Sequence, residues 1–142
     1  MKIAIGSDHA GFEMKQELIE YLKSKNLSVI DKGTYSAERA DYPDFGHAVA
    51  NVVLNKEADF GIILCGSGVG ISIAANRHKG IRAALVWNAE IAALARQHNN
   101  ANILALPARF ISKEEAYKSI DAFLSGKFEG GRHQERIEKI DI

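Results

Sequence analysis

The sequence predicts a single α/β domain in which a five-stranded parallel sheet lies between two layers of helices. Its 142 residues are the usual length of one domain. Several short apolar runs are nearly continuous in hydrophobicity, as in strands that are covered on both faces. Amphipathic stretches separate these runs. This alternation is typical of a three-layer, Rossmann-like α/β/α fold built from right-handed crossovers.

Five apolar runs are the expected strands, and they cover Lys2–Gly6, Ser28–Ile30, Asp59–Leu64, Ile81–Val86 and Asn102–Leu106. None approaches the ~20 apolar residues that a membrane span needs. The N-terminus enters the first strand without the apolar stretch of a signal peptide. We therefore expect a soluble, cytoplasmic protein without a membrane partner.

Between the predicted strands, apolar residues recur at the spacing of an amphipathic helix. Met14, Leu18, Tyr21 and Leu22 form the expected inner stripe of a first helix, with Lys15 on its solvent face.

Later helices carry start signals. Pro43 fits a helix's first turn, and Asn88 and Ser112 are placed to cap two further helices. His47 and His78 fit exposed helix positions, and we assign them no role.

The last segment departs from this alternation. Gly130-Gly131 breaks the helical pattern, and a short charged helix is expected from Arg132 to Lys139. With few apolar residues, the tail 130–142 can bury little against its own domain. It is either solvated or packed at a subunit interface. No linker divides residues 1–142 into further domains.

Composition excludes several classes of function. The 18 basic and 18 acidic residues give a net charge of zero, which argues against a nucleic-acid partner. A single cysteine, Cys65, excludes an internal disulfide and a cysteine-rich metal site. No spacing of His, Asp and Glu resembles a metal site, so we expect neither a metal nor another cofactor.

Polar residues follow three of the predicted strands. Asp8 and His9 come after the first strand, Cys65 begins a glycine-rich turn after the third, and Arg109 follows the fifth. Ligands of open parallel sheets bind beyond the carboxyl ends of the strands. This edge therefore gathers a carboxylate, an imidazole, a thiol and a guanidinium.

The glycine-rich turn, Cys65-Gly66-Ser67-Gly68-Val69-Gly70, is the strongest local signal. Its backbone N–H groups can converge on an oxyanion at a helix N-terminus. No Lys follows Gly70 as in a nucleotide-binding P-loop. Ile71 stands where a dinucleotide fold needs Gly and where a cysteine phosphatase needs Arg. The alternative to an oxyanion site is a tight strand-to-helix turn that binds no ligand.

Each candidate side chain has a structural alternative. Cys65 could be a small buried apolar residue, although a helix N-terminus favours its thiolate as nucleophile or carbon-acid base. Asp8 and His9 could form a loop cap. His98 could merely end a helix, and Arg132 and Arg136, four residues apart, could be a solvated face rather than a phosphate site.

Six segments together resemble the ribose-5-phosphate isomerase B family, in the family's order and across essentially the whole chain. They are Ser7-Asp8-His9-Ala10-Gly11, Asp41-Tyr42-Pro43-Asp44, Cys65-Gly66-Ser67-Gly68-Val69-Gly70-Ile71-Ser72, Gly80-Ile81-Arg82-Ala83, Arg96-Gln97-His98-Asn99 and Gly130-Gly131-Arg132-His133.

The resemblance implies catalytic roles. Cys65 would move a proton between C1 and C2 of the open-chain sugar, and Ser67 would handle the substrate hydroxyls. His98 would assist ring opening, with Asp8 beside the sugar. One branch of the family uses a Glu at the position of Ile71, so this chain resembles the thiol branch.

The resemblance also implies a binding site for a sugar phosphate, without a metal. His9, Arg132 and Arg136 would bind the phosphate, and Asn99 and Arg109 would complete the site. The amides of the turn would stabilise the enediolate; they belong to Gly66, Ser67, Gly68, Val69 and Gly70.

Other functions stay open at this point. Related isomerases act on allose or galactose 6-phosphate. A non-enzymatic phosphosugar or nucleotide sensor needs no thiol, and a cysteine-dependent hydrolase needs a covalent intermediate.

The direction of one helix predicts the assembly. Ten residues from Ala89 to His98 span about 15 Å and carry His98 away from the edge that holds Cys65. If both act on one sugar, a homodimer with shared active sites is required. A tetramer of two such dimers stays open.

Overall fold

The computed structural model describes all 142 residues and confirms the predicted sheet. Its strands are β1 (Lys2–Ser7), β2 (Ser28–Asp31), β3 (Phe60–Cys65), β4 (Ala83–Leu85) and β5 (Ile103–Pro107). They run parallel in the order β2-β1-β3-β5-β4.

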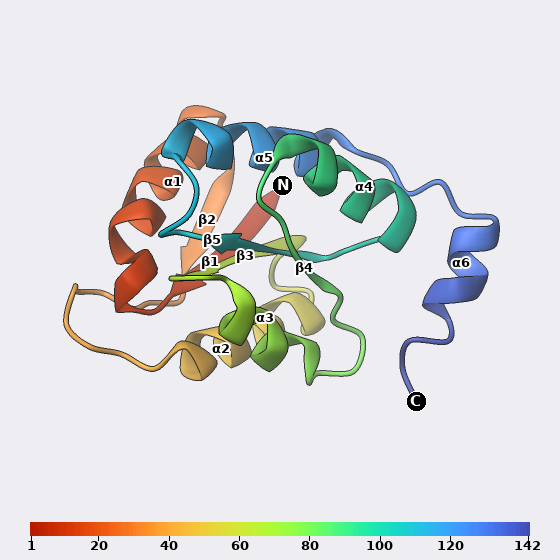
Figure 1. The fold of residues 1–142 in the computed structure, drawn as a ribbon, viewed down its shortest axis with the longest axis horizontal. Coiled ribbons are helices and arrows are strands. Elements are labelled where there is room, and N and C mark those ends of the chain that lie inside the picture. Colours follow the sequence, from red (N-terminus) through yellow and green to blue (C-terminus); the bar gives the residue numbers. More distant parts are fainter.

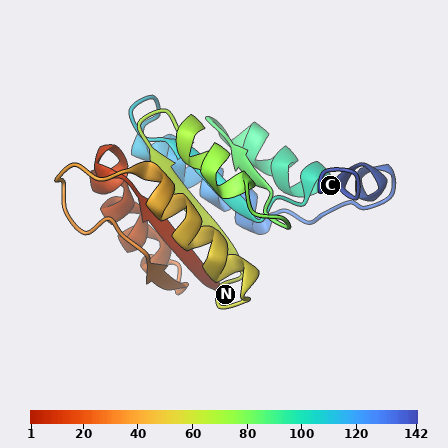
Figure 2. The ribbon, with the colours of Figure 1, turned by 90° about the horizontal axis from the view of Figure 1, so that it is seen from below.

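Helices cover both faces of the sheet, as expected (Figure 1). A short 3-10 turn, η1 (His9–Gly11), precedes the first helix. The helices are α1 (Phe12–Ser24), α2 (Tyr42–Leu54), α3 (Val69–Asn76), α4 (Ala89–Asn99), α5 (Lys113–Ser125) and α6 (Arg132–Ile137). Figure 2, turned to the face of α2 and α3, shows α6 beyond the end of α4, beside the main body.

Alternate strand residues divide the core into two halves. Ile62 and Leu64 of β3 pack with residues of α1, α4 and α5, whereas Ile63 and Cys65 pack with residues of α2 and α3. Both faces of the strand are apolar because both are covered. The same register turns the Cys65 side chain towards the layer that contains α3.

The predicted helix starts are confirmed. The side-chain oxygens of Asn88 and Ser112 accept the N–H groups of Ile91 and Glu115, and Pro43 lies in the first turn of α2. These caps satisfy amides that the helices themselves leave unpaired. None of the helices has the length and apolar character needed to cross a membrane.

The prediction for Lys15 was wrong. Its side chain is fully buried, and Nζ donates to both carboxylate oxygens of Asp31 at 2.8 and 2.9 Å. The rings of Phe12 and Tyr35 lie 5.5 and 5.8 Å from Nζ. The buried face of α1 therefore includes a charged residue whose partner lies at the end of β2.

His47 and His78 are also not the exposed helix positions that we expected. Both are partly buried, and His78 lies in the turn after α3. His47 Nδ1 lies 2.7 Å from His78 Nε2, so one ring donates and the other accepts. Burial, and then the neighbouring His47, lower the pKa of His78.

The fourth strand, Ala83–Leu85, is shorter than the predicted Ile81–Val86 and lies at the edge of the sheet. The side-chain amide of Asn76 takes the place of a neighbouring strand: it accepts from the N–H of Ala83 at 2.8 Å and donates to the Ala83 carbonyl at 2.9 Å.

Candidate active site

The site begins where β1 and β3 end side by side. Ser7 pairs with Leu64 in the sheet, so Asp8 and Gly66 leave neighbouring strand ends. The connections from these strands, α1 and α3, pack on opposite faces of the sheet. A crevice opens between such connections, which is the usual ligand position in this architecture.

The glycine-rich turn curls back onto the thiol. Cys65 is 4% exposed, and the backbone N–H of Gly68 donates to its Sγ at 3.1 Å. Gly68 has a φ of 75°, and a Cβ there would lie 2.6 Å from Leu85 Cδ1 and 3.1 Å from the carbonyl carbon of Leu106. Only glycine fits this turn without strain.

Three amides of the turn are free to meet a ligand. The N–H of Val69 donates to Ser67 Oγ at 3.2 Å, whereas the amides of Gly66, Ser67 and Gly70 have no acceptor within the chain. Unpaired amides beside a helix N-terminus attract a negatively charged oxygen. The turn thus supplies donors next to a potential base.

Asp8 and His9 flank the thiol from β1. Asp8 is buried, and its Oδ1 accepts the N–H of Gly11 at 3.1 Å, so it caps η1 as the structural alternative proposed. His9 Nδ1 lies 3.1 and 3.2 Å from the carbonyl oxygen and amide nitrogen of Ala40. The loop before α2 therefore holds the His9 ring in place.

These side chains line a hollow of about 630 Å³, which we call the thiol hollow. It unites most of the predicted site. The N–H of Arg109 donates to the Gly66 carbonyl at 3.0 Å, which brings the end of β5 to the same place. The lining residues are Asp8, His9, Ala10, Tyr42, Cys65, Gly66, Ser67, Val69, Gly70, Ile73, Arg109 and Phe110.

Sequence reasoning assigned no role to Ala10 or to three larger lining residues, Tyr42, Ile73 and Phe110. All three are large apolar side chains that are exposed in the single chain. Tyr42 belongs to one of the segments that carry the family resemblance, which was the one available signal. Together with Val69 they give the thiol hollow an apolar rim.

The remaining site residues lie elsewhere. His98, Asn99 and Arg136 line a separate hollow of about 310 Å³ together with His133, Ile137 and Ile140, which we call the histidine hollow. It lies where α4 ends and α6 begins. Arg132 is exposed on α6 and lines neither hollow. Gly68 is a buried residue of the turn and does not line the thiol hollow.

The histidine hollow contains a stacked pair of imidazoles. The rings of His98 and His133 are 4.3 Å apart and within 9° of parallel. His133 is buried, and its pKa is lowered by burial, by His98 and by Arg132, against a smaller raising effect of Glu129.

His98, Glu129 and His133 form the one cluster in the chain whose ligand atoms lie close enough to suggest a metal site, all within 4.8 Å of one another. Parallel rings direct their nitrogen lone pairs side by side rather than towards one point. Tetrahedral coordination needs ligands that converge on the ion. The cluster does not have the arrangement of a metal site.

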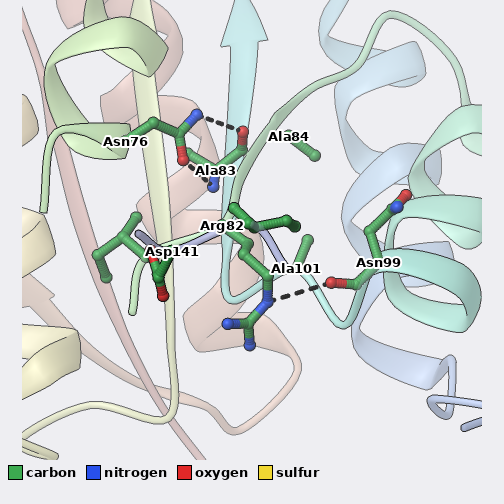
Figure 3. Close-up of a pocket in the computed structure, with 9 residues that line it drawn as sticks. Asn76, Arg82, Ala83, Ala84, Asn99, Ala101 and Asp141 are labelled. Carbon is green, nitrogen blue, oxygen red and sulfur yellow. Dashed lines mark hydrogen bonds between the residues drawn. The ribbon is translucent and has the colours of Figure 1, made fainter. Parts of the chain in front are cut away.

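A third hollow of about 400 Å³ adjoins the histidine hollow along the edge of β4 (Figure 3). Asn99 and Ile140 line both. Arg82 Nε donates to the carbonyl oxygens of Asn99 and Asn100 at 3.1 and 3.0 Å. This side chain therefore fixes the end of α4, from which His98 and Asn99 project.

Comparison with known proteins gives consistent results. A family model described as Ribose/Galactose Isomerase matches residues 3–140. Ribose-5-phosphate isomerase B of Escherichia coli is 50% identical over 139 residues, which cover 98% of this chain and 93% of that protein.

Solved structures agree with this match. The crystal structure of a ribose 5-phosphate isomerase from Thermotoga maritima is 58% identical, with a TM-score of 0.98 over 99% of this chain and 97% of that one. Ribose-5-phosphate isomerase B from Mycoplasma genitalium, with bound ribulose-5-phosphate, is 50% identical, with a TM-score of 0.92 over 98% and 93% of the two chains.

Proposed function

Because the chain belongs to the ribose/galactose isomerase family, we propose that it interconverts D-ribose 5-phosphate and D-ribulose 5-phosphate. The observation that carries the proposal is the Cys65 thiol beside the unpaired amides of Gly66 and Ser67. A base next to preorganised N–H donors is what proton abstraction beside a carbonyl requires.

The isomerisation follows from these groups. The Cys65 thiolate removes the proton from C2 of the open-chain aldose. The electrons of that C–H bond form the C1–C2 double bond, and the C1 carbonyl oxygen becomes an oxyanion. The amides of Gly66 and Ser67 stabilise this enediolate. Loss of one such donor in other enzymes costs ~10²–10³ in rate.

The second half of the reaction returns the proton. The Cys65 thiol protonates C1, and the hydroxyl proton on O2 moves to O1, which leaves a ketone at C2. Ser67 is exposed in the turn, where its hydroxyl can relay this proton. Asp8 lines the same hollow. In this proposal, its carboxylate binds the sugar hydroxyls.

Ribose 5-phosphate is a closed furanose and must first open. We assign this step to His98. The imidazolium gives a proton to the ring oxygen as the C1–O4 bond breaks, and the C1 hydroxyl gives its proton to solvent. Asn99, which lines the same hollow, completes this part of the site.

The phosphate would be held by His9, Arg132 and Arg136, with Arg109 at the sugar. A phosphate dianion fits paired guanidinium groups through charge-assisted hydrogen bonds. Binding energy from this remote group orients the reacting carbons.

These roles require two copies of the chain, because His9 and Cys65 line the thiol hollow whereas His98 and Arg136 line the histidine hollow. We propose a twofold homodimer in which the histidine hollow of one copy closes the thiol hollow of the other. The exposed apolar rim of the thiol hollow and the outlying α6 support this assembly (Figure 1).

The test is a direct assay of ribose 5-phosphate conversion in the presence of EDTA, with allose and galactose 6-phosphates in parallel. Turnover with ribose 5-phosphate in EDTA is expected. Faster turnover of a hexose phosphate would reassign the substrate. Binding without turnover of any of the three sugars would favour a phosphosugar sensor and overturn the proposal.

A further inference from the structure

One carboxylate meets both rings of the histidine stack. Glu129 Oε1 lies 3.7 Å from His98 Nε2 and 3.6 Å from His133 Nε2. The same carboxylate oxygen therefore lies close to one ring nitrogen of each imidazole. Nothing in the roles assigned above uses Glu129.

The backbone delivers Glu129 to this position. Its N–H donates to the carbonyl of Gln97 at 3.0 Å, one residue before His98. This bond ties the connection between α5 and α6 to the end of α4. The Glu129 side chain is 51% exposed, so a small rotation can shorten its 3.7 Å separation from His98 to hydrogen-bond length.

His133 gives the arrangement its asymmetry. Its side chain is 8% exposed, and its Nε2 is buried without a hydrogen-bond partner. A buried, unpaired ring stays neutral more readily than the 37% exposed ring of His98. Two stacked imidazolium ions would repel each other, which also favours a neutral His133.

We propose that Glu129 is a positioning residue for His98: it holds Nε2 of the imidazole and stabilises its protonated form, while His133 supports the ring as a flat, uncharged neighbour. An orienting carboxylate beside a proton-transferring imidazole is a recurrent device in enzymes. The inference rests on the proposed function, in which His98 gives a proton to the ring oxygen.

Two reactions of the same enzyme separate this role from a general effect on the site. Conversion of ribose 5-phosphate requires ring opening. Ribulose 5-phosphate cannot cyclise, because its C5 oxygen carries the phosphate. Exchange of its C1 hydrogen with D₂O therefore reports the Cys65 step alone, and proton NMR follows both reactions in one sample.

The variant that tests the positioning role is Glu129→Gln, which keeps the shape of the side chain and removes its negative charge. Its matched control is Glu135→Gln, which replaces an exposed acid on α6 for which the structure shows no hydrogen bond or ion pair.

We expect Glu129→Gln to lower kcat for ribose 5-phosphate about tenfold or more, a fraction of what a general acid contributes. In Glu129→Gln, the rate of C1 exchange and the KM should stay within about twofold of the wild-type values. Glu135→Gln should change neither the rate of conversion nor the rate of C1 exchange.

A second pair of variants tests whether the His133 ring supports the His98 ring. His133→Phe preserves a flat neutral ring and should keep more ring-opening activity than His133→Ala. A parallel fall of exchange and conversion in Glu129→Gln, or an equal loss in Glu135→Gln, would overturn the positioning role. If the wild-type enzyme showed neither reaction, the proposed function itself would fail, which is a distinct result.

Discussion

The backbone N–H of Gly68 donates to Sγ of Cys65 across 3.1 Å, inside a turn that closes on the sulfur. This contact fixes where the sulfur lies relative to the free amides of the turn. The arrangement joins a base and an oxyanion site within a few residues of the β3 end.

Replacing Cys65 with Ala should therefore remove most turnover. The phosphate and hydroxyl contacts do not involve the sulfur, so substrate affinity should stay within about tenfold. Steady-state kinetics and calorimetric titration with ribose 5-phosphate measure the two quantities. Substantial turnover in a correctly folded variant would refute the role of Cys65 as the base.

Arg136 and Arg132 should act on the phosphate alone. Replacing either with Ala should weaken ribose 5-phosphate binding about 10- to 100-fold, the scale of a hydrogen bond to a charged group, ~1.5–3 kcal/mol. The affinity for unphosphorylated ribose should hardly change. Equal losses for both sugars would instead assign the two arginines a structural role in the tail.

The Lys15–Asp31 pair should respond asymmetrically to substitution. Asp31→Asn leaves a fully buried ammonium without a counter-charge and should cost ~3–5 kcal/mol in the free energy of unfolding. Lys15→Met should cost less, because Asp31 is 31% exposed and water can solvate its carboxylate. Urea unfolding at a fixed protein concentration gives both values. A larger loss for Lys15→Met would contradict this reasoning.

The His47–His78 pair predicts a loss of stability in mild acid. The pKa of His78 lies below its ordinary value of 6.5 because of burial and His47, so the unfolded chain binds more protons near this pH. Its contribution to stability is present above about pH 6.5 and is lost as the pH falls further. The urea midpoint should therefore drop between pH 7.5 and 5.5.

His78→Gln should flatten this pH dependence. The flattening should be partial, because the pKa of His133 is lowered as well and acts in the same direction. An unchanged slope in His78→Gln would show that the pair does not sense pH.

Local patterns predicted the features that depend on nearby residues. The apolar run ending at Cys65 and the glycines after it placed the thiol at the correct sheet edge. The direction of the helix from Ala89 indicated that His98 lies far from that edge, and its separate hollow agrees with this prediction.

Partners distant in sequence explain what the patterns missed. Lys15 resembles a surface residue until Asp31, sixteen positions later, comes into contact with it. Glu129 and His133 have no periodicity that points to His98, because their meeting depends on how the tail crosses the end of α4. Contacts of this kind, between residues far apart in sequence, become apparent only in the folded chain.

Subunit complementation tests the shared site most directly. Cys65→Ala and His98→Ala proteins, each inactive, are mixed under conditions that exchange subunits, and native mass spectrometry confirms the heterodimers. Each heterodimer then carries one intact site and one doubly damaged site, so up to about half of the wild-type activity per dimer should return. No recovery in verified heterodimers, or full activity in an isolated monomer, would contradict the assembly proposed here.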